Sequence, residues 1–269
     1  DLVTTLQDAD MALTIDTPNG KIQLDADALQ AVSEQLDGQS QISFRVKKEA
    51  TSDYSKIVGS KAYVMSVDLY AGKDKIATFG DGTIMMKLAI PKSLEKSKIE
   101  AIYIAEDGTI QRFRNGTIVT EKTTDKDGKV TETKYYCFET NHFSVYALAK
   151  RTTVNAYAKQ LKAINALKKT GVKLTAEMVS ATETTEANVQ LTWQKTKANE
   201  VDAYQVYRAT SKKGKYTRIC TTEDVSVLSY ADSTVTFATG TTYYYKVRGV
   251  KKIGGKRYYT KWSNIVAGK

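Results

Sequence analysis

The chain has 269 residues, which is enough for two domains of about 100–150 residues, each with its own core. Residues 1–150 hold 19 Lys and Arg against 22 Asp and Glu, whereas residues 151–269 hold 21 against 8, so the net charge changes from −3 to +13. Two prolines and frequent threonine and tyrosine favour strands over disordered linkers, and two distant cysteines, Cys137 and Cys220, disfavour a disulfide framework.

The basic second half narrows the classes of partner. Such a charge attracts nucleic acid, anionic membrane or acidic cell-wall polymer. The sequence holds no recognisable nucleic-acid-binding motif, zinc-ligand cluster or glycine-rich phosphate loop, so nucleic acid is not an expected partner. No run of about 18 apolar residues exists, so no membrane insertion is expected. Two interpretations of the basic charge remain: a solvated surface without a partner, and a surface that attracts a cell-wall polymer or glycan. The first residue is Asp1, with no apolar signal core after it, which indicates a processed or recombinant fragment.

The first 47 residues predict a hairpin, a short helix and a strand. Apolar residues alternate before and after a turn at 18–20, on the faces formed by Met11, Leu13 and Ile15 and by Ile22 and Leu24. Asp25 or Asp27 caps a helix that carries Ala28, Leu29, Val32 and Leu36 and stops at Asp37-Gly38. We expect this helix to close one end of a β-sandwich, with a strand at Ile42, Phe44 and Val46 beside it.

Alternation and turn residues predict the rest of the first module. After a polar loop at 48–60, strands follow at 63–69 and 84–90, the second ended by Pro91. Asp107-Gly108 and Asn115-Gly116 predict a meander of strands 99–105, 109–114 and 117–124, because both dipeptides tolerate the positive φ of tight turns. A last hairpin turns at Asp127-Gly128 and returns through 135–148 as the closing strand. Residues 1–150 are therefore expected to form a sandwich of about eight strands.

A connector at 151–171 separates this module from a second one. Apolar residues recur there at three- and four-residue spacing before Gly171, which predicts a short amphipathic helix or a partly ordered segment. From 172 to 269 the period returns to two, with Val189, Leu191 and Trp193 on one face and Tyr243, Tyr245 and Val247 on another. Seven short strands in about 95 residues indicate a second β-sandwich.

Four stretches of residues 172–267 resemble fibronectin type III modules of secreted and surface proteins from Firmicute-type, Gram-positive bacteria, an immunoglobulin-like fold. They are Leu191-Thr192-Trp193, Val201–Arg208, Gly240–Arg248 and Trp262-Ser263-Asn264. The resemblance implies that Trp193 lies in the core and that Tyr243 fixes a corner before the sixth strand. The tripeptide Arg-Gly-Asp is absent, so integrin-type adhesion is not expected. Residues 1–150 resemble the β-rich module of bacterial surface-layer and adhesin-like proteins, with a Thr-x-His-Phe-Ser-x-Tyr strand at Thr140–Tyr146.

The tripeptide His142-Phe143-Ser144 contains the one histidine of the chain and resembles that of self-cleaving β modules, the ZU5-like and adhesion-receptor autoproteolysis families. That resemblance implies His142 as base and Ser144 as nucleophile, with the cut between Phe143 and Ser144. The other interpretation, which we favour, is a plain strand with Phe143 and Val145 on one face and His142 and Ser144 on the other.

Two further patterns are candidates for binding. Thr123-x-Asp125-x-Asp127-Gly128 imitates half a calcium loop, but Lys134 occupies the position of the bidentate glutamate, so we expect a hairpin turn and no metal or other cofactor. On the last strands, aromatic and basic residues form a face that stacks on sugars or attracts anionic polymer, or that cross-strand neighbours half bury. Its candidate ligand-binding residues are Tyr244, Tyr258, Tyr259, Trp262, Lys246 and Arg248, beside Lys256, Arg257 and Lys261.

These observations predict a mainly β, two-module fragment of an extracellular or cell-surface bacterial protein, with an adhesive, spacer or display role and no catalytic activity. Beyond the tripeptide, one histidine and separated cysteines supply neither a triad nor a metal site, and Glu106-Asp107 suits a turn. Expected partners are a cell-wall polymer or a host or environmental glycan or protein. The alternatives are an accessory glycan-binding segment of an exported carbohydrate-active enzyme and a self-cleaving module.

Overall fold

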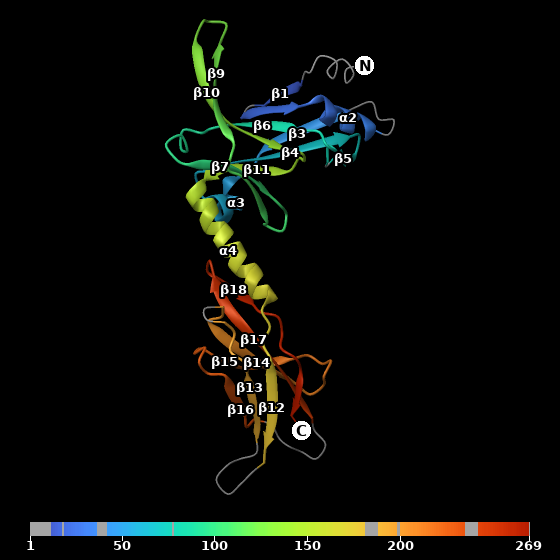
Figure 1. The fold of residues 1–269 in the computed structure, drawn as a ribbon, viewed down its shortest axis with the longest axis vertical. Helices are drawn as coiled ribbons and strands as arrows, with labels where there is room; N and C mark the ends of the chain where they lie inside the picture. The colour runs from blue at the N-terminus through green and yellow to red at the C-terminus, as the bar shows by residue number, and fades with distance from the viewer. Residues whose placement is uncertain are drawn as a thin grey trace. The chain divides into compact units, whose positions relative to one another are not determined.

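The computed structural model describes residues 12–17, 19–36, 42–76, 78–180, 188–197, 200–234 and 242–268. The chain forms two compact units, Asp1–Ala158 (unit 1) and Lys159–Lys269 (unit 2). Antiparallel sheets make up most of both units, so the predicted mainly β fold is confirmed (Figure 1). The division between the units falls within helix α4 (Arg151–Lys169), inside the stretch expected to be a connector.

Unit 1 is a sandwich of two antiparallel sheets. The first has the order β1 (Leu13–Thr17), β2 (Gly20–Leu24), β6 (Ile84–Ala89), β10 (Val130–Thr140) and β9 (Thr117–Thr124). The second has the order β3 (Ile42–Lys48), β4 (Tyr63–Ala71), β11 (Val145–Lys150), β7 (Ile99–Ile104) and β8 (Ile110–Phe113), and β5 (Asp74–Ile76) pairs with β4. The described residues hold eleven strands rather than about eight, in part because β5 is added and 135–148 divides into two strands.

The core of unit 1 lies between these sheets. Every second residue of the central strands points inward, as the alternation predicted, and is almost fully buried: Ile22, Leu24, Met86 and Leu88 on one side, and Met65, Val67, Leu69, Tyr146 and Leu148 on the other. Each buried aliphatic side chain contributes about 1.5–3 kcal/mol relative to an exposed one.

Helix α2 (Ala26–Glu34) confirms the predicted capped helix. The Asp25 Oδ1 atom accepts a hydrogen bond from the Ala28 amide at 2.8 Å, and Oδ2 accepts one from the Thr83 amide at 2.9 Å. The helix therefore has its first turn tied to the chain just before β6, and it buries Ala28, Leu29 and Val32 against the core. The predicted stop at Asp37-Gly38 and the residues Met11 and Pro18 of the predicted hairpin lie outside the described residues.

The polar loop expected at 48–60 is wrong, because it contains helix α3 (Thr51–Val58). Its apolar side chains Tyr54, Ile57 and Val58 follow helical spacing and pack on the outer face of the second sheet, against Val64, Ile102 and Ala147. The segment is short and mostly polar, and no side chain caps its start. Packing on the sheet stabilises this helix rather than any strong local preference.

The meander expected around Asn115-Gly116 is also wrong. Strand β8 pairs with β7 in the second sheet, whereas β9 pairs with β10 in the first, so 114–116 crosses between the sheets. A Cβ on Gly116 would lie 2.3 Å from a Tyr136 ring carbon and 2.6 Å from the Cys137 carbonyl oxygen, so close approach explains this glycine. The hairpin at Asp127-Gly128 is confirmed, with φ of 77° at Gly128, and it extends beyond the rest of unit 1 (Figure 1).

Helix α4 has one end in each core. Val154 is buried with Val64, Ile102 and Ala147 of unit 1. Leu167 is buried with Val172 and Leu174 of unit 2. The helical form of the predicted connector is therefore the one present, over 19 residues.

Unit 2 is a second sandwich. One sheet has the order β12 (Leu174–Val179), β13 (Asn188–Trp193) and β16 (Ser229–Asp232). The other has the order β15 (Thr217–Thr222), β14 (Ala203–Ala209), β17 (Tyr243–Ile253) and β18 (Lys256–Tyr259), with β19 (Val266–Gly268) also paired with β17. Trp193 is buried in the core with Leu191, Tyr204, Tyr245 and Val247, as predicted for this tryptophan.

A buried carboxylate links the two sheets of unit 2. Asp232 is inaccessible to solvent, and it accepts hydrogen bonds from the Tyr245 hydroxyl at 3.0 Å and the Arg208 guanidinium at 2.8 Å. Burial by itself raises the pKa of Asp232, but hydrogen bonds from Thr234, Arg208 and Tyr245 outweigh it and hold the pKa below its ordinary value. Tyr243 is half-buried, with the Arg208 guanidinium 5.3 Å from its ring centroid, and its corner role stays a prediction.

Candidate functional site

The stretch His142-Phe143-Ser144 is a link between two sheets and not part of a strand. Strand β10 ends at Thr140 in the first sheet and β11 begins at Val145 in the second, so the favoured strand interpretation is wrong here. Regular strand pairing is interrupted because the backbone passes from one sheet to the other here, and His142 forms only an isolated bridge with Thr78. Phe143 anchors the crossing, since it is only 3% exposed and meets the Phe79 ring edge to face, with centroids 4.8 Å apart.

The polar groups of His142 are engaged with neighbours other than Ser144. Its Nδ1 atom lies 3.2 Å from both Thr140 Oγ1 and Asn141 Oδ1, and its carbonyl accepts a hydrogen bond from the Tyr146 hydroxyl. Burial lowers the pKa of His142 below its ordinary value. Ser144 lines a hollow of about 420 Å³ next to α3, and its carbonyl accepts from the Val67 amide at 2.9 Å. Within the described residues, no hydrogen bond joins the His142 ring to Ser144.

The half-pattern of a calcium loop forms the tip of the β9–β10 hairpin. The Asp125 Oδ1 atom accepts hydrogen bonds from the Asp127 amide at 3.0 Å and the Lys129 amide at 2.9 Å, so this carboxylate stabilises the turn. Across the described ranges, no group of three or more His, Cys, Asp and Glu side chains is arranged to hold a metal ion.

The predicted aromatic and basic face of unit 2 forms an ordered stack, which we call the ladder: Tyr216, Lys246, Trp262, Arg248 and Tyr259. The Lys246 Nζ atom is 4.1 Å from the Tyr216 ring centroid and 4.0 Å from that of Trp262. The Arg248 guanidinium carbon is 4.5 Å from the Trp262 centroid and 3.7 Å from that of Tyr259. Cations and rings therefore contact each other in turn on the outer face of the sheet that contains β14 and β17.

Strand pairing brings two more residues to the ladder. Tyr207 and Gln205 of β14 lie opposite Lys246 and Arg248 of β17. The Arg248 guanidinium donates to the Tyr207 hydroxyl at 2.6 Å and to Gln205 Oε1 at 3.3 Å, and the Tyr207 ring meets Trp262 edge to face. Sequence reasoning missed Gln205, Tyr207 and Tyr216. Alternation in 203–209 indicates that Gln205 and Tyr207 share one face of their strand, but it does not indicate that β17 pairs with that strand.

The structure brings together four of the six predicted binding residues: Trp262, Lys246, Arg248 and Tyr259. Tyr258 packs against the core instead, because it lies on the opposite side of β18 from Tyr259. Tyr244 lies on the same side of β17 as Lys246, opposite Ala209, beyond the stacked part of the face.

The charges of the ladder are not neutralised. Burial lowers the pKa of Lys246, and the nearby positive charge of Arg248 lowers it further by a smaller amount. Among the described residues, no carboxylate oxygen comes within 4 Å of the charged groups of Lys246 or Arg248. The cations already lie against the ring faces, although Trp262 is still 40% exposed. This geometry suits attraction of an anion better than stacking of a neutral sugar.

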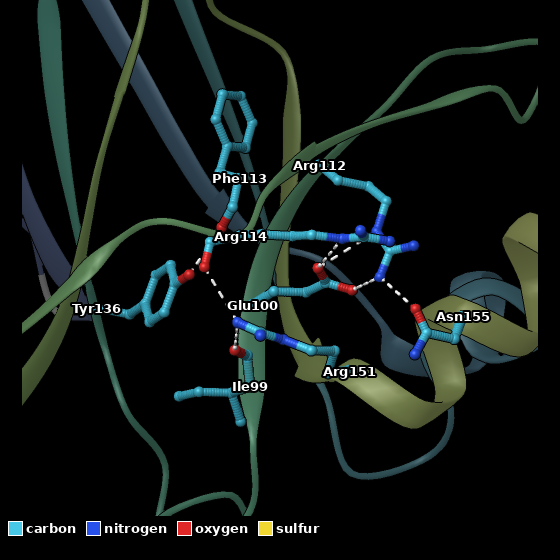
Figure 2. A network of polar contacts seen from close by, with 8 residues as sticks. All are labelled: Ile99, Glu100, Arg112, Phe113, Arg114, Tyr136, Arg151 and Asn155. Atoms are coloured by element: carbon cyan, nitrogen blue, oxygen red, sulfur yellow. Dashed lines mark hydrogen bonds and ion pairs between the residues drawn. The ribbon is translucent and has the colours of Figure 1, made fainter.

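A second polar cluster, in unit 1, is structural. Glu100 is inaccessible to solvent and binds the Arg112 guanidinium through both oxygens, with Arg114 at 3.5 Å (Figure 2). Arg112 also donates to Asn155 Oδ1 of α4 at 2.7 Å, and Arg151 donates to the Arg114 carbonyl at 3.0 Å. Figure 2 shows Arg112 and Arg114 against this carboxylate, and Arg151 of α4 directed at the backbone carbonyls of Ile99 and Arg114. The network therefore fixes the start of α4 on the second sheet.

None of the helices in the described ranges combines the length and apolar character that crossing a membrane requires.

Comparisons with protein-family models and with curated proteins gave no match. Among solved structures, pectate lyase PelI from Erwinia chrysanthemi in complex with tetragalacturonic acid is 22% identical over 35% of this chain, with a TM-score of 0.26. An Fn3-like protein from Clostridium thermocellum is 29% identical over 34% of this chain and 84% of its own, with a TM-score of 0.24. The FN1–FN3 domains of chicken CNTN1 are 8% identical over 77% of this chain and 74% of their own, with a TM-score of 0.29. These structures, two of them with fibronectin type III-like domains, are similar to parts of the chain, and the chain covers 28% of the pectate lyase chain.

Proposed function

We propose that this chain is a non-catalytic part of a bacterial cell-surface or secreted protein and that unit 2 binds an acidic polymer of the cell wall or its surroundings. The observation that carries the proposal is the ladder, in which Lys246 and Arg248 are held between aromatic rings with no carboxylate partner among the described residues. The net charge of +13 over residues 151–269 also favours a negatively charged partner.

The stack makes these two cations effective. Free lysine and arginine side chains lose rotamer freedom when they bind, at a cost of about 0.5–1.5 kcal/mol each. Trp262 and Tyr259 already restrict Lys246 and Arg248, so much of this cost is met during folding. The attraction of an exposed cationic face weakens as salt rises, because the screening length falls from about 10 Å at 0.1 M to about 3 Å at 1 M.

Unit 1 has a supporting role in this proposal, as a spacer or display module. Its Glu100 network ties the start of α4 to the second sheet, which gives the chain leading to unit 2 an anchored beginning. The same surface would serve an accessory glycan-binding segment of an exported carbohydrate-active enzyme, and a catalytic domain elsewhere in the open reading frame distinguishes the two.

The experiment is co-sedimentation of the 269-residue chain with purified Gram-positive cell wall, before and after chemical removal of its anionic polymers, at about 0.1 M and about 1 M salt. We expect binding that anionic polymer and low salt both require. The Lys246→Gln/Arg248→Gln variant should lose it, whereas the Lys173→Gln/Lys195→Gln control, with the same charge change on exposed residues outside the ladder, should keep most of it.

Circular dichroism of each variant shows whether it is folded. Equal binding by the two folded variants, binding that survives removal of the anionic polymers, or no binding of the parent chain at low salt would each overturn the proposal.

A further inference from the structure

We infer that a hollow beside the ladder holds one acidic sugar residue of the polymer, which makes unit 2 a carbohydrate-binding module rather than a general basic surface. The inference rests on the proposed function and names the unit of the polymer that is recognised. The hollow has a volume of about 340 Å³ and lies on the outer face of the same sheet as the ladder. That volume is near the lower end of the range for ligand pockets, about 300–1,000 Å³, and suits a single sugar ring.

Three basic residues from three strands line this hollow: Arg218 of β15, Lys252 of β17 and Arg257 of β18. Lys252 and Arg257 lie directly opposite each other in the β17–β18 pairing. Like charges in that position repel, so an anion between them would relieve an unfavourable contact. In the described part of the chain, none of the three has a carboxylate within 4 Å.

Hydrogen-bonding groups for hydroxyls line the same hollow. Asp202 and Glu223 contribute carboxylates, Thr221 a hydroxyl and Gln205 an amide. Asp202 is held in place, because its Oδ2 atom accepts a hydrogen bond from the Lys252 amide at 2.8 Å. Carboxylate, hydroxyl and amide groups all form hydrogen bonds with sugar hydroxyls. Cations and acceptors together match a ring that carries both hydroxyls and one carboxylate or phosphate.

Gln205 connects the hollow to the ladder. Its side chain lines the hollow, and its Oε1 atom accepts hydrogen bonds from Arg248 at 3.3 Å and from the Tyr207 hydroxyl at 3.0 Å. A polymer that lies along the ladder would therefore reach the hollow without leaving the sheet face.

The test uses monosaccharides, which separate this site from general attraction of a polymer. Amide chemical shifts of the full chain are followed with galacturonate against galactose, and with glucose 1-phosphate against glucose. We expect the amides of Thr221 and Lys252 to shift with at least one charged sugar and with neither neutral one. The charged sugar that binds identifies the source of the anion as uronate or sugar phosphate.

Arg218→Gln/Arg257→Gln should weaken the charged sugar at least about tenfold, since each lost charge-assisted hydrogen bond is worth about that much or more. The Lys173→Gln/Lys195→Gln control should change it less than twofold. Shifts absent with both charged sugars, equal shifts with the neutral ones, or unchanged affinity in the folded arginine variant would overturn the inference. Each of these results leaves polymer binding through Lys246 and Arg248 standing, because that is measured separately by sedimentation.

Discussion

Replacing Glu100 by glutamine removes the carboxylate that pairs with Arg112 and Arg114 of unit 1. Glu100 is fully buried, and the Arg112 side chain bound to it is only 15% exposed. The substitution keeps the size of the side chain but leaves Arg112 as a buried charge without its partner. It should destabilise unit 1 while leaving the sheets of unit 2 intact.

The magnitude follows from burial. Breaking a buried ion pair from one side costs about 3–5 kcal/mol, because the remaining charge stays desolvated. Arg114 is 53% exposed and lies 3.5 Å from the carboxylate, so Arg114→Gln should cost no more than about 1 kcal/mol. Replacing both partners, as in Glu100→Met/Arg112→Met, leaves no unpaired charge and should cost far less than Glu100→Gln.

The position of the tryptophans makes the two units separable in a urea titration. Trp193 and Trp262 both belong to unit 2, so tryptophan emission follows that unit alone, whereas far-ultraviolet circular dichroism follows both. For a slope of about 2 kcal/mol per molar urea, Glu100→Gln should lower the midpoint of the unit 1 transition by about 1.5–2.5 M. The emission midpoint should stay within the error of the parent chain.

Three results would refute this reasoning. A Glu100→Gln midpoint within about 0.3 M of the parent would mean that the pair contributes little, and a loss equal to that of Arg114→Gln would mean that burial does not decide the cost. A double methionine variant as unstable as Glu100→Gln would show that packing, and not the unpaired charge, is responsible.

Three further predictions concern the links and turns of unit 1. Freshly purified protein, denatured and run on a gel, should give one full-length band, because the His142 ring is bonded away from Ser144; fragments of 143 and 126 residues would prove the cut after Phe143. Burial lowers the folded-state pKa of His142, so the unfolded state binds the proton more readily and the stability of the protein should decline as pH falls below about 6.5. The His142→Gln variant should show a smaller decline between about pH 7 and 5.5, and a pH profile equal to that of the parent chain would count against this prediction. Calcium should leave the melting temperature unchanged, because Asp125 already accepts backbone amides at the hairpin tip, and a rise of several degrees in a calcium titration would contradict this.

Local sequence signals located most elements of both units. Two-residue alternation placed the strands 42–46, 63–69 and 84–90, the last two with their buried faces, and Asp25 or Asp27 identified the start of a helix. These signals work because each depends on residues only a few positions apart. Helix α3 escaped them, since its stability comes from the sheet on which it packs.

Local signals failed where the chain leaves one sheet for the other. Asn115-Gly116 has the composition of a hairpin turn, yet the space beside Tyr136 requires the glycine for a crossing. The stretch 135–148 alternates across its length, yet residues 141–144 pass from one sheet to the other, with Phe143 buried in the core. A turn residue indicates which backbone angles the chain tolerates at that position, but it does not indicate which two strands pair on either side of the turn.

The features of the candidate site also separate into those that the sequence determines and those that depend on strand pairing. The sequence by itself determined that unit 2 is basic and that Lys246 and Arg248 share one side of a strand with rings nearby. Only the tertiary structure decided that Tyr207 and Gln205 lie opposite them, that Tyr258 turns to the core, and that Arg218, Lys252 and Arg257 converge on one hollow. The physical reason is that side-chain direction repeats every two residues along any strand, whereas strand pairing depends on burial summed over distant segments.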